Sequence, residues 1–165
     1  MARPQAFSPG GAIDQPGDAS GRVERIILAT DLSAVSAHAA DRAIALAREQ
    51  GAELIVLSVV DPNGLRLPGG RFLRRMDQER ARVEAGAQAI VLRARAAGAR
   101  ATFLVWEGDP AETILSASAS ERADLIILGS HERGRLGRLM LGSISTRVSE
   151  DAECQVLVVP RDPND

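Results

Sequence analysis

The sequence predicts an α/β domain in which helices pack on a parallel sheet. Five short apolar runs alternate with helical patterns along the chain, which is the order expected for parallel strands joined by crossover helices. The run 54–60 is β-branched and unalternating, which is typical of a strand buried on both faces. The chain has 165 residues, of which 45% are apolar, so it can form one domain with a sizeable core.

The first two strands flank a helix. Residues 25–30 and 54–60 are the apolar runs. Between them, Ala34–Gln50 has helical spacing, with Ser33 suited to the N-cap and Gly51 to the position after the last turn. The predicted inward face of this helix consists of Ala37, Ala40, Ile44 and Ala47.

A long helix and a third strand follow the loop 61–70. Residues 71–97 have a helical pattern, and residues 101–106 predict the strand. The predicted inward face of the helix consists of Val83, Ala87, Ile90, Val91 and Ala94. Arginine and acidic residues crowd its first half, which we interpret as a solvated face in preference to a partner site.

The last third of the chain contains two helices and two strands. Asp109 can cap a helix over 110–122, with Pro110 at its first position and Glu112 completing a capping box. Residues 125–128 predict the fourth strand, and Gln155–Val159 the fifth. Between them, residues 143–152 predict the last helix, with Ser143 as its cap.

A glycine-rich segment, 129–143, leads from the fourth strand to the last helix. Glycines let backbone N–H groups approach an anion, and a helix N-terminus offers unpaired donors and a partial positive charge. The segment therefore predicts a phosphate site. The alternative is a long surface loop with turn glycines.

An acidic residue, Asp31, follows the first strand. In such sheets ligands sit beyond the carboxyl ends of the strands, where the strand order reverses. If the first and fourth strands are neighbours there, Asp31 faces Gly129 across one crevice, and its carboxylate can accept hydrogen bonds from a ribose or a base. The alternative is that Asp31 is only a turn or cap residue.

Composition excludes several functions. The formal net charge of −2 favours neither nucleic acid nor an anionic membrane as a partner. No apolar run approaches the roughly 20 residues that span a bilayer. Every basic residue is arginine, so the P-loop NTPases, which need Gly-Lys-Ser/Thr, are excluded together with Schiff-base and kinase-type lysine chemistry.

The chain ends and the single cysteine complete the domain prediction. Residues 1–21 are rich in Pro, Gly, Ala and Ser, which predicts a disordered tail and no signal peptide. We expect the domain to cover residues 22–161, followed by a tail of residues 162–165. Cys154 has no companion, so no intrachain disulfide is expected, which agrees with a cytoplasmic protein.

Several short motifs occur in a specific order. They are Ala29-Thr30-Asp31 with Ser33, Val59-Val60-Asp61, Gly108-Asp109-Pro110, Gly129 with Gly142-Ser143 at the end of the loop, and the closing segment from Cys154 to Pro160. With these motifs the chain resembles the universal stress protein family over residues 23–160.

The resemblance implies a doubly wound sheet of strand order 3-2-1-4-5, counted along the chain, with helices on both faces. It also implies that the protein binds ATP, with or without Mg²⁺. Asp31 would meet the adenosine end, and the backbone near Val59 would line the adenine pocket. The implied nucleotide site consists of Ala29, Thr30, Asp31, Val59, Leu128, Gly129, Ser130, Glu132, Arg133, Gly142, Ser143 and Ile144.

One position departs from the family pattern. The second glycine of the loop is replaced by Glu132. At about 5 Å and an effective dielectric of about 20, a like charge costs roughly 3 kcal/mol, whereas a helix N-terminus returns about 0.3–2 kcal/mol. Arg133 and the other arginines of the loop could neutralise Glu132 or bind phosphate, and Glu132 could also point outward or approach phosphate through Mg²⁺.

Three functions follow from the sequence. The first is an ATP-binding regulatory protein in stress response or signalling, acting on an unknown protein partner. The second is a dimeric stress module that has lost nucleotide through Glu132. The third is a slow ATP hydrolase or phosphotransferase, which we rank last because no catalytic residue and no metal ligand can be assigned.

The last strand predicts how the chain assembles. In the order 3-2-1-4-5, Gln155–Val159 is an edge strand that is apolar and lacks lysine and proline. Pairing with its own copy would satisfy the free backbone groups and bury Val156 or Val158 across a two-fold axis. We therefore expect a homodimer. The alternative is that the C-terminal segment or a helix covers this edge.

Overall fold

The strands of the chain lie side by side in one parallel sheet, in the order β3-β2-β1-β4-β5. The computed structural model describes residues 22–65, 72–130 and 142–160. The strands are β1 (Arg25–Ala29), β2 (Glu53–Val60), β3 (Arg100–Glu107), β4 (Leu125–Gly129) and β5 (Gln155–Val159). The helices are α1 (Ala34–Gln50), η1 (Asn63–Leu65, a 3-10 turn), α2 (Phe72–Ala96), α3 (Pro110–Ser120) and α4 (Ser143–Asp151). The predicted fold class and strand order are confirmed.

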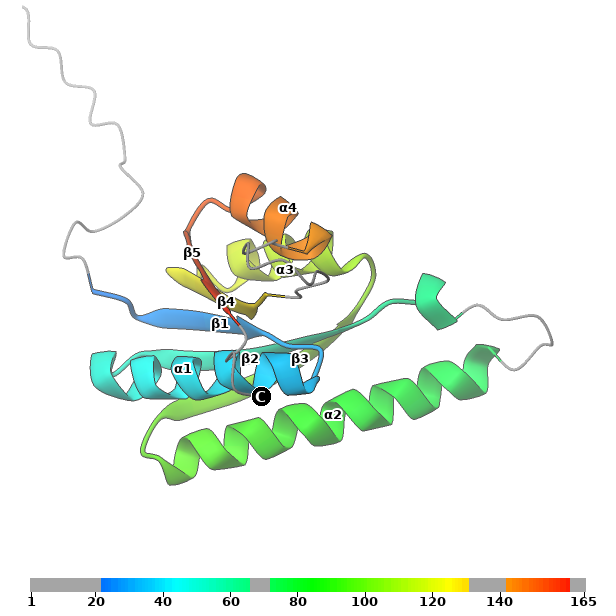
Figure 1. Cartoon of the computed structure of the whole chain (residues 1–165). Helices are drawn as coiled ribbons and strands as arrows, with labels where there is room; N and C mark the ends of the chain where they lie inside the picture. Colours follow the sequence, from blue (N-terminus) through cyan, green and yellow to red (C-terminus); the bar gives the residue numbers. More distant parts are fainter. Residues whose placement is uncertain (1–21, 66–71, 131–141, 161–165) are drawn as a thin grey trace, which may run out of the picture.

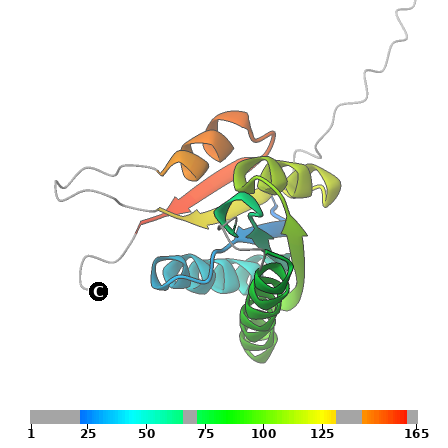
Figure 2. The ribbon, with the colours of Figure 1, turned by 90° about the vertical axis from the view of Figure 1, so that its right-hand side faces the viewer.

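The helices cover both faces of the sheet. Successive side chains of a strand point to opposite faces, so Ile26 and Leu28 of β1 pack with α1 and α2, whereas Ile27 packs with α3 and α4. Figure 2 shows these two helical layers above and below the sheet. The central strands are thus buried on both sides, as the unalternating run in β2 predicted.

Helix α1 has the predicted bounds and caps, and three of its four predicted inward residues are buried, namely Ala40, Ile44 and Ala47. Ser33 accepts a hydrogen bond from the Ser36 backbone, and Gly51 adopts the left-handed conformation at φ 67°. Ala37 is exposed, contrary to the prediction. Ser36 takes the inward place one turn before Ala40, because its side chain is bonded to the end of β1.

Helix α3 begins as predicted and ends earlier. Asp109 caps it by accepting a hydrogen bond from the Glu112 backbone at 3.0 Å, and Pro110 occupies the first helical position. The helix stops at Ser120 instead of continuing to Arg122, because Arg122 has a left-handed φ of 50° that cannot continue a right-handed helix.

Helix α2 is longer than the sheet that it covers. Its 25 residues span about 37 Å, whereas the eight residues of β2 span about 26 Å. Its buried residues begin at Val83 and continue through Ala87, Val91 and Ala94, as predicted, with Ile90 half-buried. The first turns of α2, residues 72–82, contain no buried residue and extend past the carboxyl ends of the strands (Figure 1).

Several predictions lie outside the described residues. These are the tails 1–21 and 162–165, and the loop residues Glu132 and Arg133. Among the helices that the structure describes, none combines the length and the apolar character needed to cross a bilayer.

Candidate functional site

The carboxyl ends of β1 and β4 lie next to each other at the centre of the sheet. The two strands pair in parallel, with Ala29 opposite Leu128. Asp31 and Gly129 therefore follow neighbouring strand ends, as the crevice prediction required. Strand β2 pairs with the other side of β1 and brings Val59 to the same edge. This edge is where a doubly wound sheet binds its ligand.

Hydrogen bonds hold the turn between β1 and α1 in one conformation. Thr30 is buried; its N–H donates to Leu57 O at 2.9 Å, and its hydroxyl donates to Ser36 Oγ at 2.9 Å. The same hydroxyl accepts from the Leu32 N–H at 3.0 Å, and Ser58 Oγ donates to Thr30 O at 3.1 Å. The turn is thus tied to β2 and to the first turn of α1.

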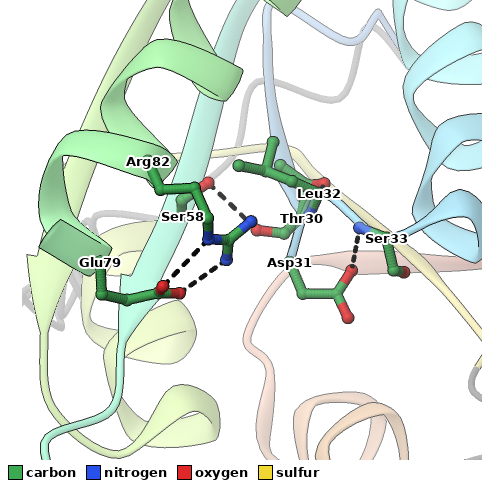
Figure 3. A network of polar contacts seen from close by, with 7 residues as sticks. All are labelled: Thr30, Asp31, Leu32, Ser33, Ser58, Glu79 and Arg82. Atoms are coloured by element: carbon green, nitrogen blue, oxygen red, sulfur yellow. Dashed lines mark hydrogen bonds and ion pairs between the residues drawn. The ribbon is translucent and has the colours of Figure 1, made fainter. Parts of the chain in front are cut away.

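Asp31 sits at the outer side of this turn. Its carboxylate is exposed, and Oδ1 accepts a hydrogen bond from the Ser33 N–H at 3.0 Å (Figure 3). The next residue, Leu32, has a left-handed φ of 63°, a rare conformation for a leucine. Asp31 therefore acts as a turn residue and also presents its carboxylate at the carboxyl edge of the sheet.

On the β4 side, the chain leaves the sheet through Gly129 and Ser130. The Ser130 N–H donates to Val159 O at 2.9 Å, and Ser145 Oγ donates to Gly129 O at 3.4 Å. Ser130 is fully buried, and among the described residues its hydroxyl is the buried side-chain atom that lacks a hydrogen-bond partner. A buried hydroxyl without a partner is unfavourable and marks a place where a ligand or water would be favoured.

The N-terminus of α4 closes this side of the site. The N-cap is Gly142, not Ser143 as predicted, and glycine has no side chain with which to cap the helix. Gly142 has the extended backbone of a cap, with ψ 163°, and its carbonyl already accepts from the Thr146 N–H, so Ser143 is the first helical residue. Ser143 and Ile144 are exposed, and the backbone N–H groups at a helix N-terminus suit an anion.

The structure separates the predicted site residues into two groups. The side chains of one group are buried, so only their backbone could reach a ligand: Ala29, Thr30 and Leu128. Members of the other group are exposed or half-buried around the edge: Asp31, Val59, Gly129, Gly142, Ser143 and Ile144. Ser130 is buried, and its hydroxyl has no hydrogen-bond partner within the part of the chain that the structure describes.

Arg147 fixes the direction of α4. Its Nη1 lies 3.1 Å from Asp109 Oδ1, and its Nη2 lies 2.8 Å from Glu112 Oε1. The hydrogen bond to Glu112 raises the pKa of this guanidinium, and although burial opposes the shift, the negative charges of Asp109 and Glu112 add to it. The sequence assigned Asp109 and Glu112 to capping alone, and no local pattern could reveal a partner on α4.

The sequence also missed Arg82 and Glu79. These residues of α2 form an ion pair close to Asp31 (Figure 3), whereas the charge pattern of the helix predicts only a solvated face. One signal could have found them. The apolar stripe of α2 begins only at Val83, which indicates that the preceding turns do not pack on the sheet. They therefore extend past the carboxyl ends of the strands (Figure 1).

Metal ligands and the single cysteine are two further features of the described residues. No group of three or more His, Cys, Asp or Glu side chains is placed to hold a metal there. Cys154, at the amino end of β5, is half-buried, and burial raises the pKa of its thiol. The described part of the site thus combines an exposed carboxylate, Asp31, with the N-terminus of a helix, α4, at neighbouring strand ends.

A family model and individual relatives point to the same protein family. The model of the universal stress protein family matches residues 22–160. "Universal stress protein in QAH/OAS sulfhydrylase 3'region" of Thermus aquaticus is 39% identical over 137 residues, covering 81% of this chain and 96% of that protein. Universal stress protein MJ0531 of Methanocaldococcus jannaschii is 33% identical over 146 residues, covering 84% of this chain and 82% of that protein.

Two solved structures with bound nucleotide have the same fold. A universal stress protein in complex with cAMP superposes with a TM-score of 0.63 at 26% identity, covering 84% of this chain and 98% of that one. A family member from Arabidopsis thaliana with AMP bound has a TM-score of 0.64 at 18% identity, covering 86% of this chain and 94% of that one, a likeness of fold alone.

Proposed function

Because this chain belongs to the universal stress protein family, we propose that it binds an adenine nucleotide, with ATP as the preferred ligand, and regulates a stress or signalling response through a protein partner. One observation carries the proposal: exposed Asp31 and the N-terminus of α4, whose N-cap is a glycine, lie at neighbouring strand ends. A nucleotide has the matching polarity, since its ribose and base donate hydrogen bonds and its phosphates accept them.

In this proposal, different residues of the site bind the two ends of the nucleotide. Asp31 takes the adenosine end, and the end of β2 near Val59 lines the adenine. Gly129, Gly142 and Ser143 face the ribose and phosphates, where a glycine lets the backbone approach closely. The cAMP and AMP complexes of related proteins support an adenine ligand. Mg²⁺ would arrive on the phosphates, as is usual for a cation that keeps most of its waters.

Two other functions remain as alternatives in the proposal. Glu132 could prevent nucleotide binding and leave a dimeric interaction module. Slow hydrolysis of ATP is the weaker alternative, because the described site supplies no assigned base or nucleophile. Turnover of Mg-ATP by the purified protein distinguishes hydrolysis from binding.

We further propose a homodimer that forms through β5 in the cytoplasm. Strand β5 is an edge strand, and its residues 156–159 are only half-buried. The single cysteine, Cys154, agrees with a reducing compartment.

Titration calorimetry with ATP, ADP and GTP tests the proposed ligand. We expect ATP and ADP to bind and GTP to bind more weakly. Gly142→Val should weaken ATP, because a branched side chain obstructs the approach of phosphate to the backbone. Ser149→Val, an exposed change further along α4, is the matched control. If the wild type binds neither ATP nor ADP at millimolar concentration, the proposal is wrong.

A further inference from the structure

Arg82 of α2 lies beside Asp31, at the end of the site that the proposed function assigns to adenosine. Figure 3 shows its side chain extending from α2 toward the β1–α1 turn. Arg82 Nε donates to Glu79 Oε2 at 2.9 Å, and Nη2 donates to Glu79 Oε1 at 2.6 Å. This two-bond fork leaves Arg82 little rotational freedom and fixes the direction of its guanidinium plane.

One nitrogen of the guanidinium, Nη1, takes no part in the hydrogen bonds to Glu79. Those hydrogen bonds use Nε and Nη2, and the remaining nitrogen points away from Glu79, on the side of Thr30 and Asp31 (Figure 3). The hydrogen bond to Glu79 raises the pKa of Arg82, burial opposes this shift, and the negative charges of Glu79 and Asp31 raise the pKa further. Asp31 is thus one of the negative charges near the Arg82 guanidinium.

A second contact keeps Arg82 in this position. Gly86 lies one turn after Arg82, on the same side of α2, and packs against the Leu32 side chain. Leu32 is the residue next to Asp31, and its N–H is bonded to Thr30 Oγ1. Gly86 thus lets α2 pack closely on the turn that carries Asp31, one helical turn away from Arg82.

We propose that Arg82, held by Glu79, is a positioning residue of the nucleotide site that orients the Asp31 carboxylate toward the adenosine end of the ligand. The inference rests on the proposed function. A carboxylate held in its binding orientation loses less conformational freedom when the ligand arrives, so affinity rises without a new contact. The side chains of Arg82 and Glu79 are 54% and 31% exposed, so solvent screening keeps the effect modest.

The test compares Arg82→Gln with Arg80→Gln by calorimetry, using AMP and ATP as ligands. Arg80 is the matched control, because it lies on the same helix and also forms ion pairs, but with Glu84 and Glu107. Arg82→Gln should weaken AMP and ATP by the same factor, about two- to fivefold, because the effect is exerted at the adenosine end. Arg80→Gln should leave both affinities unchanged, and Arg82→Lys should fall between Arg82→Gln and the wild type.

Asp31→Asn completes a double-mutant cycle. If Arg82 acts through Asp31, Arg82→Gln should cost no further affinity once Asp31 is Asn. Equal affinities of wild type and Arg82→Gln, additive losses in the cycle, or a loss that grows from AMP to ATP would each overturn the inference; the last would mean direct contact with phosphate. A wild type that binds neither nucleotide would instead refute the proposed function.

Discussion

Gly86 of α2 lies so close to Leu32 that a Cβ atom at position 86 would come within 2.4 Å of Leu32 Cδ1. Leu32 has a left-handed backbone, and its neighbours Asp31 and Ser33 are joined by a hydrogen bond. A glycine in the middle of a helix costs about 0.5–1 kcal/mol relative to alanine. We infer that this cost is offset by the close packing of α2 on the turn that carries Asp31, where a larger residue would force the Leu32 side chain to move.

Gly86→Ala should therefore destabilise the wild type in spite of its better helix propensity. Overpacking costs about 1–3 kcal/mol and outweighs the gain in propensity. In a Leu32→Ala background the same change should stabilise the protein by about 0.5–1 kcal/mol, since the clash is gone. Urea unfolding of the wild type, Gly86→Ala, Leu32→Ala and the double variant measures whether the effect of Gly86→Ala on the free energy of unfolding changes sign. A wild type stabilised by Gly86→Ala would show that Leu32 moves aside freely.

Asp109 has two partners, and two substitutions separate them. It caps α3 through the Glu112 N–H, and it also pairs with Arg147 of α4. Asp109→Ala should lower the free energy of unfolding by about 0.5–2 kcal/mol, the usual cost of a lost cap. Asp109→Asn keeps a capping oxygen and loses the charge, so it should retain most of the stability. Equal losses in thermal or urea unfolding would mean that the ion pair, not the cap, matters.

The fold could be predicted because local signals agreed with one another. The capping residues Ser33 and Asp109 and the terminal Gly51 fixed helix ends, and unbroken apolar runs marked the strands. The errors arose where a long-range contact overrode local pattern. Ala37 is outside because Ser36 is bonded to Thr30, and Ser143 is not the cap because the backbone of Gly142 takes that role.

The candidate site could be predicted only where strand order alone brings residues together. Asp31 and Gly129 follow paired strands, so topology places them. Arg82 lies 51 positions after Asp31 in the sequence, on a different element. It comes close to Asp31 because α2 extends past the strand ends and packs on the turn at Gly86, and neither feature can be recognised from a local pattern. For the same reason, the contact of Arg147 with α3 could not be foreseen from either helix alone.

The reactivity of Cys154 should follow the raised pKa of its thiol. Burial disfavours the thiolate, so at neutral pH the folded protein contains less thiolate than an exposed cysteine would. Maleimide should label the native protein more slowly than the urea-unfolded protein, and the native rate should increase as pH rises. Equal rates in the two states at neutral pH would contradict this expectation.

Glu132 should tune nucleotide affinity. Glu132→Gly removes a negative charge and the bulk of a side chain, so the backbone can approach the phosphates more closely. ATP should therefore bind more tightly, by about 1–3 kcal/mol. Glu132→Gln removes the charge but keeps the bulk, and thus separates the two effects. Calorimetry with Mg-ATP measures both variants. Unchanged affinity would mean that the carboxylate points away or is already neutralised, and weaker binding would mean that it bridges to the metal.

The backbone of β5 shows which of its residues face the free edge. The Gln155 N–H donates to Asp124 O, and Val159 O accepts from Ser130, so both positions face β4. Peptide groups alternate in direction along a strand, and Val156 and Val158 therefore direct theirs away from β4. The opposite edge, β3, already has a side-chain partner, because Arg95 donates two hydrogen bonds to Ala101 O. This difference favours β5 as the strand that pairs with a second copy.

Val158→Pro should convert the proposed dimer to a folded monomer. Proline removes an N–H that faces the free edge, so the antiparallel ladder between copies is lost while the ladder to β4 is kept. Leu157→Pro is the matched contrast, because position 157 faces β4 and the change should destabilise the fold itself. Light scattering with size-exclusion chromatography gives the mass, and circular dichroism the fold. A wild type that is monomeric at tens of micromolar, or a Val158→Pro protein that remains a stable dimer, would refute assembly through β5.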